Sequence, residues 1–201
     1  GEIRFDFVTP NEVIKNIQLG VPVKINIENS VGSMALAYLN GATADELRHA
    51  ISSFQGAKRR FDFLLKTDKL VMIDDYAHHP QELAASITSV KALYPDKKLT
   101  GIFQPHLYSR TKDFADEFAR SLSLLDELIL LDIYPAREKP IEGVTSQIIF
   151  DKVTCPKTLC KKEELLSLLN KKDDIEVLLT VGAGDIDQLL MPIKQLLEDR
   201  S

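Results

Sequence analysis

Two short polar segments contain three of the four histidines in this chain. The first segment is residues 74–80 (Asp-Asp-Tyr-Ala-His-His-Pro), and the second is residues 104–110 (Gln-Pro-His-Leu-Tyr-Ser-Arg). Imidazole groups gain or lose a proton near neutral pH, carboxylates accept hydrogen bonds, and a guanidinium group holds a carboxylate or phosphate with two parallel hydrogen bonds. These residue types therefore indicate a site that binds anions or moves protons.

Each polar segment directly follows an apolar run that is typical of a buried strand. Leu70–Ile73 precedes the first segment and Leu99–Phe103 precedes the second. Nearly continuous hydrophobic runs are expected for parallel strands that helices cover on both faces. Because ligands of such sheets bind beyond the carboxyl ends of the strands, we expect both segments to lie at one edge of a sheet. Two polar loops without a function are the less favoured interpretation.

Residues 57–201 alternate between strand-like and helix-like segments. This alternation predicts an α/β fold with a mostly parallel sheet flanked by helices, of the Rossmann-like kind. The predicted helices are one over about residues 80–94, one carrying Phe114, Phe118, Leu122 and Leu125, and a last one after Gly182-Ala183-Gly184; further strands are predicted at Leu128–Ile133 and Val177–Val181.

Residues 1–56 have a different pattern. Ile3–Val8 and Val23–Ile27 alternate apolar and polar side chains, which predicts a two-stranded hairpin, and two helices follow. We expect Asn29 or Ser30 to cap the first helix, and Thr43 with Glu46 to form a capping box for the second. A hairpin and two helices without a central sheet are typical of the end of a preceding domain.

The composition predicts a globular protein without a nucleic-acid or membrane partner. The 201 residues are 44% hydrophobic and carry a net charge of −5. A negative net charge without a basic block argues against general binding to nucleic acid or anionic membranes. The apolar stretches are too short to span a bilayer. We therefore expect a cytoplasmic location.

Five motifs in chain order resemble those of the Mur ligase family. They are Gly56-x3-Arg60-Phe61-Asp62, residues 74–80, residues 104–111, Tyr134-Pro135-Ala136-Arg137-Glu138-x-Pro140-Ile141-x-Gly143, and Gly182-Ala183-Gly184-Asp185-Ile186. The resemblance implies that residues 1–56 are the C-terminal part of a central ATP-binding domain and that residues 57–201 are the family's C-terminal domain. Within the family, the motifs are most similar to those of enzymes that add L-alanine to UDP-N-acetylmuramate.

The reaction implied by this resemblance belongs to peptidoglycan synthesis and uses ATP and Mg²⁺. ATP phosphorylates the carboxylate of UDP-N-acetylmuramate, and the amine of L-alanine attacks the acyl phosphate to form an amide. No Gly-x4-Gly-Lys-Ser/Thr sequence occurs in the chain. We therefore expect the phosphate-binding loop and its magnesium ligand to lie in upstream domains, and this chain alone to be inactive.

The resemblance also implies roles for individual residues in binding the nucleotide. Arg60 would approach the ATP phosphates, and Asp75 would accept hydrogen bonds from the ribose hydroxyl groups. Many members begin a helix with a His-Asn-x-x-Asn pattern that contacts the nucleotide, and the alignment of this pattern with residues 28–32 retains only Asn29. Asn29 would then contact the nucleotide or merely cap the helix.

The substrates would be held by the two polar segments. The resemblance places Tyr76, His78 and His79 at the cleft shared with the upstream domains, with His78 as the main positioning group. His106, with Tyr108 and Arg110 after it, would lie near the amino acid and the muramoyl carboxylate. Arg110 would hold a carboxylate, and His106 would orient the amine or accept its proton.

Three other functions fit parts of the sequence. A related recycling ligase attaches a whole tripeptide to UDP-N-acetylmuramate. A metal-dependent hydrolase would use His78, His79 and His106 with the adjacent aspartates as ligands, although their spacing matches none of the stronger ligand patterns. A non-catalytic nucleotide-binding module would need no upstream domain.

Overall fold

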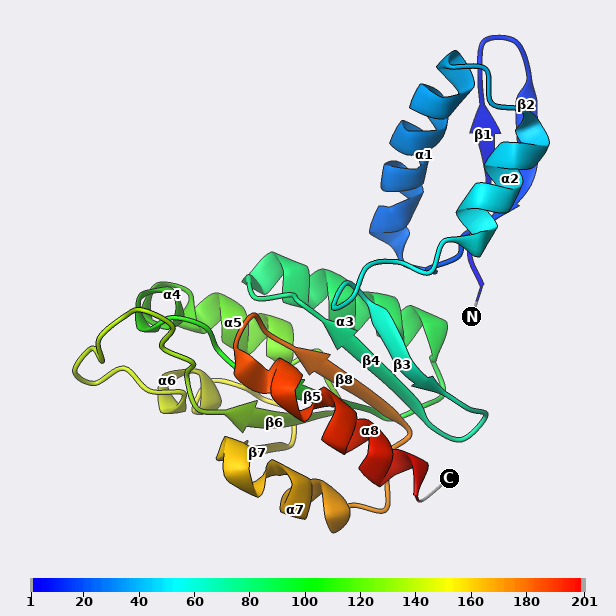
Figure 1. Cartoon of the computed structure of the whole chain (residues 1–201). Helices are drawn as coiled ribbons and strands as arrows, with labels where there is room; N and C mark the ends of the chain where they lie inside the picture. Colours follow the sequence, from blue (N-terminus) through cyan, green and yellow to red (C-terminus); the bar gives the residue numbers. More distant parts are fainter. Residues whose placement is uncertain (1, 200–201) are drawn as a thin grey trace. The chain divides into compact units, whose positions relative to one another are not determined.

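The computed structural model describes residues 2–199, which fall into two compact units that divide between Lys58 and Arg59 (Figure 1). The first unit contains strands β1 (Arg4–Val8) and β2 (Val13–Gln18) and helices α1 (Lys24–Leu39) and α2 (Ala44–Ser53). The strands form an antiparallel hairpin. One face of this hairpin packs against both helices, and the buried residues are Phe7, Ile14, Ile17, Met34 and Leu47. The assignment of this first unit to a central ATP-binding domain stays a prediction.

The predicted hairpin has the wrong second strand. Residues 23–27 were expected to pair with the first strand, but Val13–Gln18 does so, and Lys24 begins α1. Alternation over only five residues is too short a signal to exclude the start of a helix. The short turn decides the outcome, because Thr9 accepts a hydrogen bond from the backbone N–H of Glu12 at 3.0 Å and closes the hairpin early.

The two predicted helix caps had different outcomes. Asn29 and Ser30 lie inside α1 and do not begin it, because the helix starts at Lys24 after Val23. The capping box of α2 is confirmed: the Glu46 side chain accepts a hydrogen bond from the Thr43 backbone N–H at 2.8 Å, and the Thr43 hydroxyl accepts one from the Glu46 N–H at 3.3 Å.

The second unit is built on a six-stranded sheet with the order β3-β4-β8-β5-β6-β7. The strands are β3 (Asp62–Lys66), β4 (Val71–Asp75), β5 (Leu99–Phe103), β6 (Glu127–Leu131), β7 (Lys157–Cys160) and β8 (Val177–Val181). All neighbouring strands pair in parallel except β3, which is antiparallel to β4. The predicted mostly parallel α/β fold is confirmed, while edge strands β3 and β7 were not predicted.

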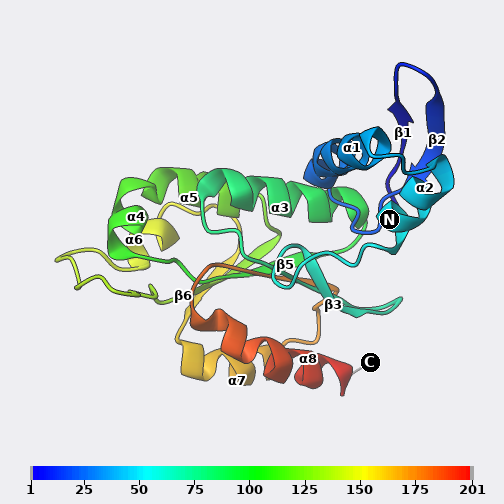
Figure 2. The ribbon, with the colours of Figure 1, turned by 45° about the horizontal axis from the view of Figure 1, so that its top comes forward.

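Helices cover both faces of this sheet (Figure 2). One face carries α3 (Pro80–Leu93), α4 (Tyr108–Asp113), α5 (Ala115–Leu122) and α6 (Gln147–Phe150). The other carries α7 (Leu165–Asn170) and α8 (Leu190–Glu198), which follow the 3₁₀ turns Lys162–Glu164 and Asp185–Leu189. Buried side chains of both layers hold the sheet, among them Leu83, Ile87, Val90, Phe118 and Leu122 on the first face and Leu165, Leu169, Ile193 and Leu197 on the second.

The helix predicted around Phe114 is two helices. Phe114 has a non-helical backbone with φ −117° and ψ 21°, and it separates α4 from α5. Its ring packs edge-on against that of His79, with the centroids 4.9 Å apart. Phe118 remains in the core, where its ring lies 5.4 Å from that of Phe103 on β5. The break therefore lets α4 follow its own direction while α5 covers the sheet.

No helix in the described part of the chain is long and apolar enough to cross a membrane.

Strand β8 lies between β4 and β5, so the Gly182-Ala183-Gly184 turn separates the two histidine segments. The Gln104 N–H donates to the Val181 carbonyl at 3.2 Å, and the Gln104 side-chain oxygen accepts from the Ile186 N–H at 2.9 Å. A Cβ atom on Gly182 would lie 2.6 Å from the Gln104 carbonyl oxygen, and one on Gly184 would lie 2.3 Å from its side-chain oxygen. Both glycines are therefore required for the close approach of Gln104.

We expect Gly182→Ala to destabilise the second unit by about 2–4 kcal/mol, because the added Cβ meets a backbone oxygen and Gly182 has φ +134°. Gly143→Ala is the matched control, since Gly143 also has a positive φ of +76° but faces open space. The control should lose only about 1 kcal/mol. Urea unfolding of both variants measures the difference, and equal losses would contradict the close-approach argument.

Candidate functional site

The candidate site lies at the carboxyl ends of β4, β8, β5 and β6, which meet at one edge of the sheet. The segment after β4 supplies Tyr76 and His78. The segment after β5 supplies His106 and Arg110, and the loop after β6 supplies Tyr134 and Glu138. Parallel strands place these segments together although they are far apart in the sequence.

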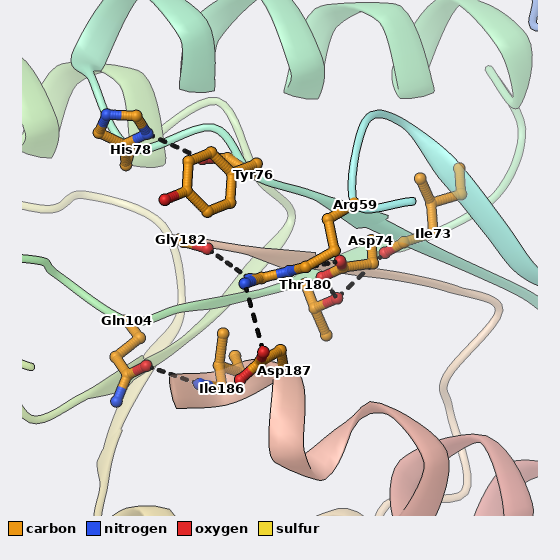
Figure 3. Close-up of polar contacts among 10 residues, drawn as sticks. All are labelled: Arg59, Ile73, Asp74, Tyr76, His78, Gln104, Thr180, Gly182, Ile186 and Asp187. Atoms are coloured by element: carbon orange, nitrogen blue, oxygen red, sulfur yellow. Dashed lines mark hydrogen bonds and ion pairs between the residues drawn. The ribbon is translucent and has the colours of Figure 1, made fainter. Parts of the chain in front are cut away.

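Tyr76 and His78 form a compact pair at the end of β4 (Figure 3). Their rings meet edge-to-face with centroids 5.2 Å apart. His78 Nδ1 lies 2.9 Å from the Tyr76 carbonyl oxygen. Because a carbonyl oxygen only accepts hydrogen bonds, Nδ1 carries the proton and Nε2 of neutral His78 is left as an acceptor. The Glu82 carboxylate accepts from the His78 and His79 N–H groups at 3.0 and 3.2 Å, which fixes this loop at the start of α3.

His106 is held between Tyr134 and Arg110. The strand pairing of β5 and β6 extends beyond both strands through a parallel bridge between His106 and Tyr134, whose rings stack 5.8 Å apart. Arg110 Nη1 lies 3.4 Å from His106 Nδ1, one helical turn further along the chain. The rings of His106 and His78 are 6.4 Å apart. The two histidine segments therefore come together at the sheet edge.

Glu138 connects the loop after β6 to the start of α4. Its carboxylate accepts hydrogen bonds from the Ser109 N–H at 2.9 Å and from the Ser109 hydroxyl group. These bonds from Ser109 lower the pKa of Glu138, so the carboxylate is ionised at neutral pH. Tyr108 is the first residue of α4 and Arg110 follows within the same turn. The Glu138 contact thus fixes the segment that carries both predicted substrate-binding residues.

The surroundings of His106 favour its neutral form. Burial, followed by the positive charge of Arg110 and by that of His78 when His78 is protonated, lowers the pKa of His106, and the Glu138 carboxylate opposes this shift in part. Neutral imidazole can accept a proton or a hydrogen bond, which a protonated ring cannot do. The site therefore contains a weakly basic acceptor beside a guanidinium group.

The two aspartates at the end of β4 have different surroundings. Asp74 is fully buried, and this burial raises its pKa, while hydrogen bonds from Thr180 and the charge of Arg59 oppose the shift. Burial also raises the pKa of Asp75, and hydrogen bonds such as those from the main chain of Phe61 and Tyr76 offset only part of it. Asp75 as a residue is half-buried at the end of β4, whereas Asp74 is fully buried.

Two arginines lie against the ring of Tyr76. The guanidinium carbons of Arg59 and Arg60 are each 5.2 Å from the ring centroid. Arg60 is exposed, whereas Arg59 is half-buried. The exposure of Arg60 to solvent is what a phosphate-binding role would require.

Two of the predicted site residues lie outside this cluster of contacts. The ring of His79 packs against Phe114, which is a structural contact at the start of α3. Asn29 belongs to the first unit and is exposed on α1, where its side-chain amide donates to the Asn26 side-chain oxygen at 3.3 Å. Binding roles for His79 and Asn29 stay predictions.

The observed start of α1 changes where Asn29 lies in the helix. Because α1 begins at Lys24, residues 28–32 lie inside the helix and not at its start, where the resemblance expected the His-Asn-x-x-Asn pattern. Asn26 lies in the first turn and accepts the hydrogen bond from the Asn29 side chain. We therefore add Asn26 to Asn29 as a candidate polar contact at this helix start, which the sequence prediction missed.

Sequence reasoning also gave no role to Arg59, and none to Glu138 or Gln104 beyond membership of a motif. The signal for Arg59 was its position beside Arg60, before a strand that ends in two aspartates. Glu138 and Gln104 act on neighbours 29 and 82 positions away along the chain. Pairings over such distances follow from the order of strands in the sheet, which the sequence does not state.

Among the residues that the structure describes, no group of three or more histidine, cysteine, aspartate or glutamate side chains is arranged to hold a metal ion. His78 and His106 face each other with Tyr76, Tyr134 and Arg110 around them. Aromatic and cationic neighbours suit an anionic ligand better than a metal cation.

Comparison with known proteins finds relatives that match along nearly the whole chain. Residues 59–186, more than half of the chain, match the family model described as "Mur ligase, glutamate ligase domain". UDP-N-acetylmuramate–L-alanine ligases of Parabacteroides distasonis and Phocaeicola vulgatus are 64% and 59% identical over 98% and 100% of this chain. The chain covers 43% and 44% of those two proteins, which is less than half of their length.

A solved structure shares the fold as well. The crystal structure of the UDP-N-acetylmuramate–alanine ligase MurC of Thermotoga maritima matches 94% of this chain with a TM-score of 0.76 and 26% identity, and the match covers 43% of that protein. Both the family model and this structural match include the sheet whose edge carries the histidine segments. The chain belongs to the Mur ligase family.

Proposed function

We propose that this chain is the C-terminal part of a cytoplasmic, ATP-dependent ligase that joins L-alanine to UDP-N-acetylmuramate in peptidoglycan synthesis. The observation that carries the proposal is the meeting of His78, His106 and Arg110 at one sheet edge, in a chain 64% identical to a ligase of that name. A reaction between a carboxylate, a triphosphate and an amino acid brings several anions together. It therefore needs cationic groups and a proton acceptor in one place.

Arg110 and His106 form the part of the site that meets the amino acid. The guanidinium group of Arg110 offers two parallel hydrogen bonds to a carboxylate of L-alanine or of the muramoyl group. Arg110 Nη1 lies 3.4 Å from His106 Nδ1, and because a guanidinium group only donates, Nδ1 is the acceptor nitrogen of neutral His106. The surroundings favour this neutral form, so once Arg110 turns to a carboxylate, Nδ1 can accept a hydrogen bond or proton from the attacking amine. An amine must be deprotonated before it attacks an acyl phosphate, which gives a neutral imidazole at this position a chemical task.

Tyr76, His78, His79 and Tyr108 would surround the substrates. His78 presents Nε2 as an acceptor, because Nδ1 is bonded to the Tyr76 carbonyl oxygen. The Tyr76 and Tyr108 rings offer apolar faces with a hydroxyl group at the edge. His79 contributes indirectly through the packing of its ring against Phe114, which lies just after the helix that carries Arg110.

The residues of this chain fit part of an ATP site. Arg60 is exposed and can bind phosphate oxygens, and Asp75 can accept hydrogen bonds from ribose hydroxyl groups at the sheet edge. Asn26 and Asn29 lie on successive turns of α1 with hydrogen-bonded side chains and would contact the nucleotide. ATP supplies the phosphoryl group that activates the carboxylate.

The described residues do not by themselves fit a magnesium site, since no three carboxylate or histidine side chains converge. We assign Mg²⁺ and the phosphate-binding loop to the upstream domains of the protein, consistent with a chain that spans 43% of its relative. The metal-dependent hydrolase receives no support from this donor set. The tripeptide-recycling ligase remains the rival within the family, and the choice between substrates rests on a few contacts.

The chain joined to its upstream domains should release ADP and phosphate only when both L-alanine and UDP-N-acetylmuramate are present, and the 201-residue chain alone should not. A coupled enzyme assay measures the release of ADP, and mass spectrometry identifies the amide product. Turnover with the L-Ala-D-Glu-diaminopimelate tripeptide in place of L-alanine would support the recycling ligase. ATP turnover by the chain alone would contradict a site shared with upstream domains.

In the complete ligase, Arg110→Ala and His106→Ala should each lower kcat/KM for L-alanine by about 10²-fold or more, because each removes a group that binds or deprotonates the amino acid. Arg120→Ala is the matched control, since Arg120 is exposed on α5, outside the five motifs, and forms an ion pair with Glu117 of the same helix. This variant should retain full activity. Steady-state kinetics at varied L-alanine concentration provide the measurement. Unchanged kinetics in both test variants would remove these two residues from the proposed site.

The pH at which His106 takes up a proton should lie below the ordinary histidine value of 6.5, because burial and the adjacent positive charges disfavour its charged form. His106 therefore stays neutral as the pH falls through 6.5 and gains its proton only at lower pH. NMR titration of the histidine ring signals measures this. Arg110→Gln removes a positive charge and should raise the pKa of His106, while Arg137→Gln should leave it unchanged. A pKa of His106 at or above 6.5 in the wild-type chain would contradict the prediction.

A further inference from the structure

Arg59 makes more contacts than a residue that only balances the charge of Asp74 would need. Its Nε donates to Asp74 Oδ2 at 3.2 Å, its Nη2 donates to the Gly182 carbonyl oxygen at 2.7 Å, and its Nη1 lies 3.8 Å from Asp187 Oδ2 (Figure 3). One guanidinium group thus connects the end of β4 to the turn after β8. The Arg59 side chain is 20% exposed and that of Asp74 is fully buried.

The same residue also contacts Tyr76 in two ways. The guanidinium carbon lies 5.2 Å from the centre of the Tyr76 ring, and the Arg59 carbonyl oxygen accepts a hydrogen bond from the Tyr76 N–H at 2.7 Å. Arg59 has φ +60°, a left-handed backbone that only a few per cent of residues other than glycine adopt. A backbone held in this conformation indicates that the surrounding contacts determine it.

Tyr76 transmits this constraint to His78. The Tyr76 carbonyl oxygen bonds His78 Nδ1 at 2.9 Å and its ring packs against the imidazole at 5.2 Å, so the orientation of Tyr76 sets both the tautomer and the direction of His78. The chain of contacts therefore runs from a buried carboxylate through Arg59 and Tyr76 to a side chain at the sheet edge.

We propose that Arg59, anchored by Asp74 and Gly182, is a positioning residue that holds Tyr76 and thereby orients His78 for the ligase reaction. The proposal rests on the proposed function for its kinetic consequences, while the orientation of His78 can be tested without any substrate. Lysine cannot replace arginine here, because it has a single charged nitrogen and no flat surface to lie on the tyrosine ring.

Three variants separate positioning from simple stabilisation. Arg59→Lys keeps a positive charge beside Asp74 but loses the bond to Gly182 and the stacking on Tyr76. Thr180→Val is the matched control, because Thr180 donates to the other oxygen of Asp74 at 2.6 Å, and the substitution removes that bond while leaving every Arg59 contact in place. Tyr76→Leu removes the residue through which Arg59 would act.

In the complete ligase, Arg59→Lys should lower kcat/KM by at least about tenfold. Thr180→Val should lower the melting temperature at least as much as Arg59→Lys and leave kcat/KM of the folded protein within about twofold. If Arg59 acts through Tyr76, then adding Arg59→Lys to Tyr76→Leu should cause little further loss, because effects within one chain of contacts do not add. The proposal would be overturned if the loss of kcat/KM in the double variant equalled the product of the two single losses. Equal losses of kcat/KM in Arg59→Lys and Thr180→Val would overturn it as well.

The substrate-free test uses the 201-residue chain labelled on its histidines, which number four. Arg59→Lys should shift the ring signals of His78, while the signals of His49 in the first unit should stay unchanged. Unshifted His78 signals would overturn the proposal. If the complete wild-type ligase shows no turnover with L-alanine, the proposed function fails, and the histidine spectra still decide whether Arg59 orients His78.

Discussion

The parallel pairing of β8 with both β4 and β5 is the constraint on which the candidate site depends. Because β8 lies between the other two strands, its end bonds to both: the Gly182 N–H donates to the Asp75 carbonyl at 3.3 Å, and the Val181 carbonyl accepts from Gln104 at 3.2 Å. The two histidine segments are thereby fixed on either side of one glycine-containing turn. Gln104 can approach that turn only because Gly182 and Gly184 have no side chains.

Buried charge at the end of β4 serves this arrangement. An unpaired carboxylate in the interior would be strongly destabilising, so the fully buried Asp74 requires the guanidinium group of Arg59 and the hydroxyl group of Thr180. These partners come from residues before β3 and from β8, which ties three parts of the chain together. The neighbouring residues Arg60, which is exposed, and Asp75, which is half-buried, do not take part in this pairing.

The accuracy of the predicted secondary structure followed the strength of the hydrophobic signal. Apolar runs predicted β4, β5, β6 and β8 within one or two residues, since fully buried parallel strands have a clear hydrophobic signature. The predictions failed where the signal was short or ambiguous. Residues 23–27 fit two kinds of element, the break at Phe114 depends on packing against His79, and the edge strands β3 and β7 are only partly buried.

The sequence by itself determined the alternation of strands and helices and the polar segments at strand ends, because these follow from local composition and spacing. The family was indicated separately, by the resemblance of five motifs. Only the tertiary structure decided that β8 separates the two histidine segments, that Arg59 reaches Gly182 across 123 positions of the chain, and that Tyr134 stacks on His106. Such contacts depend on strand order and on close packing in three dimensions, and no local pattern of residues specifies either.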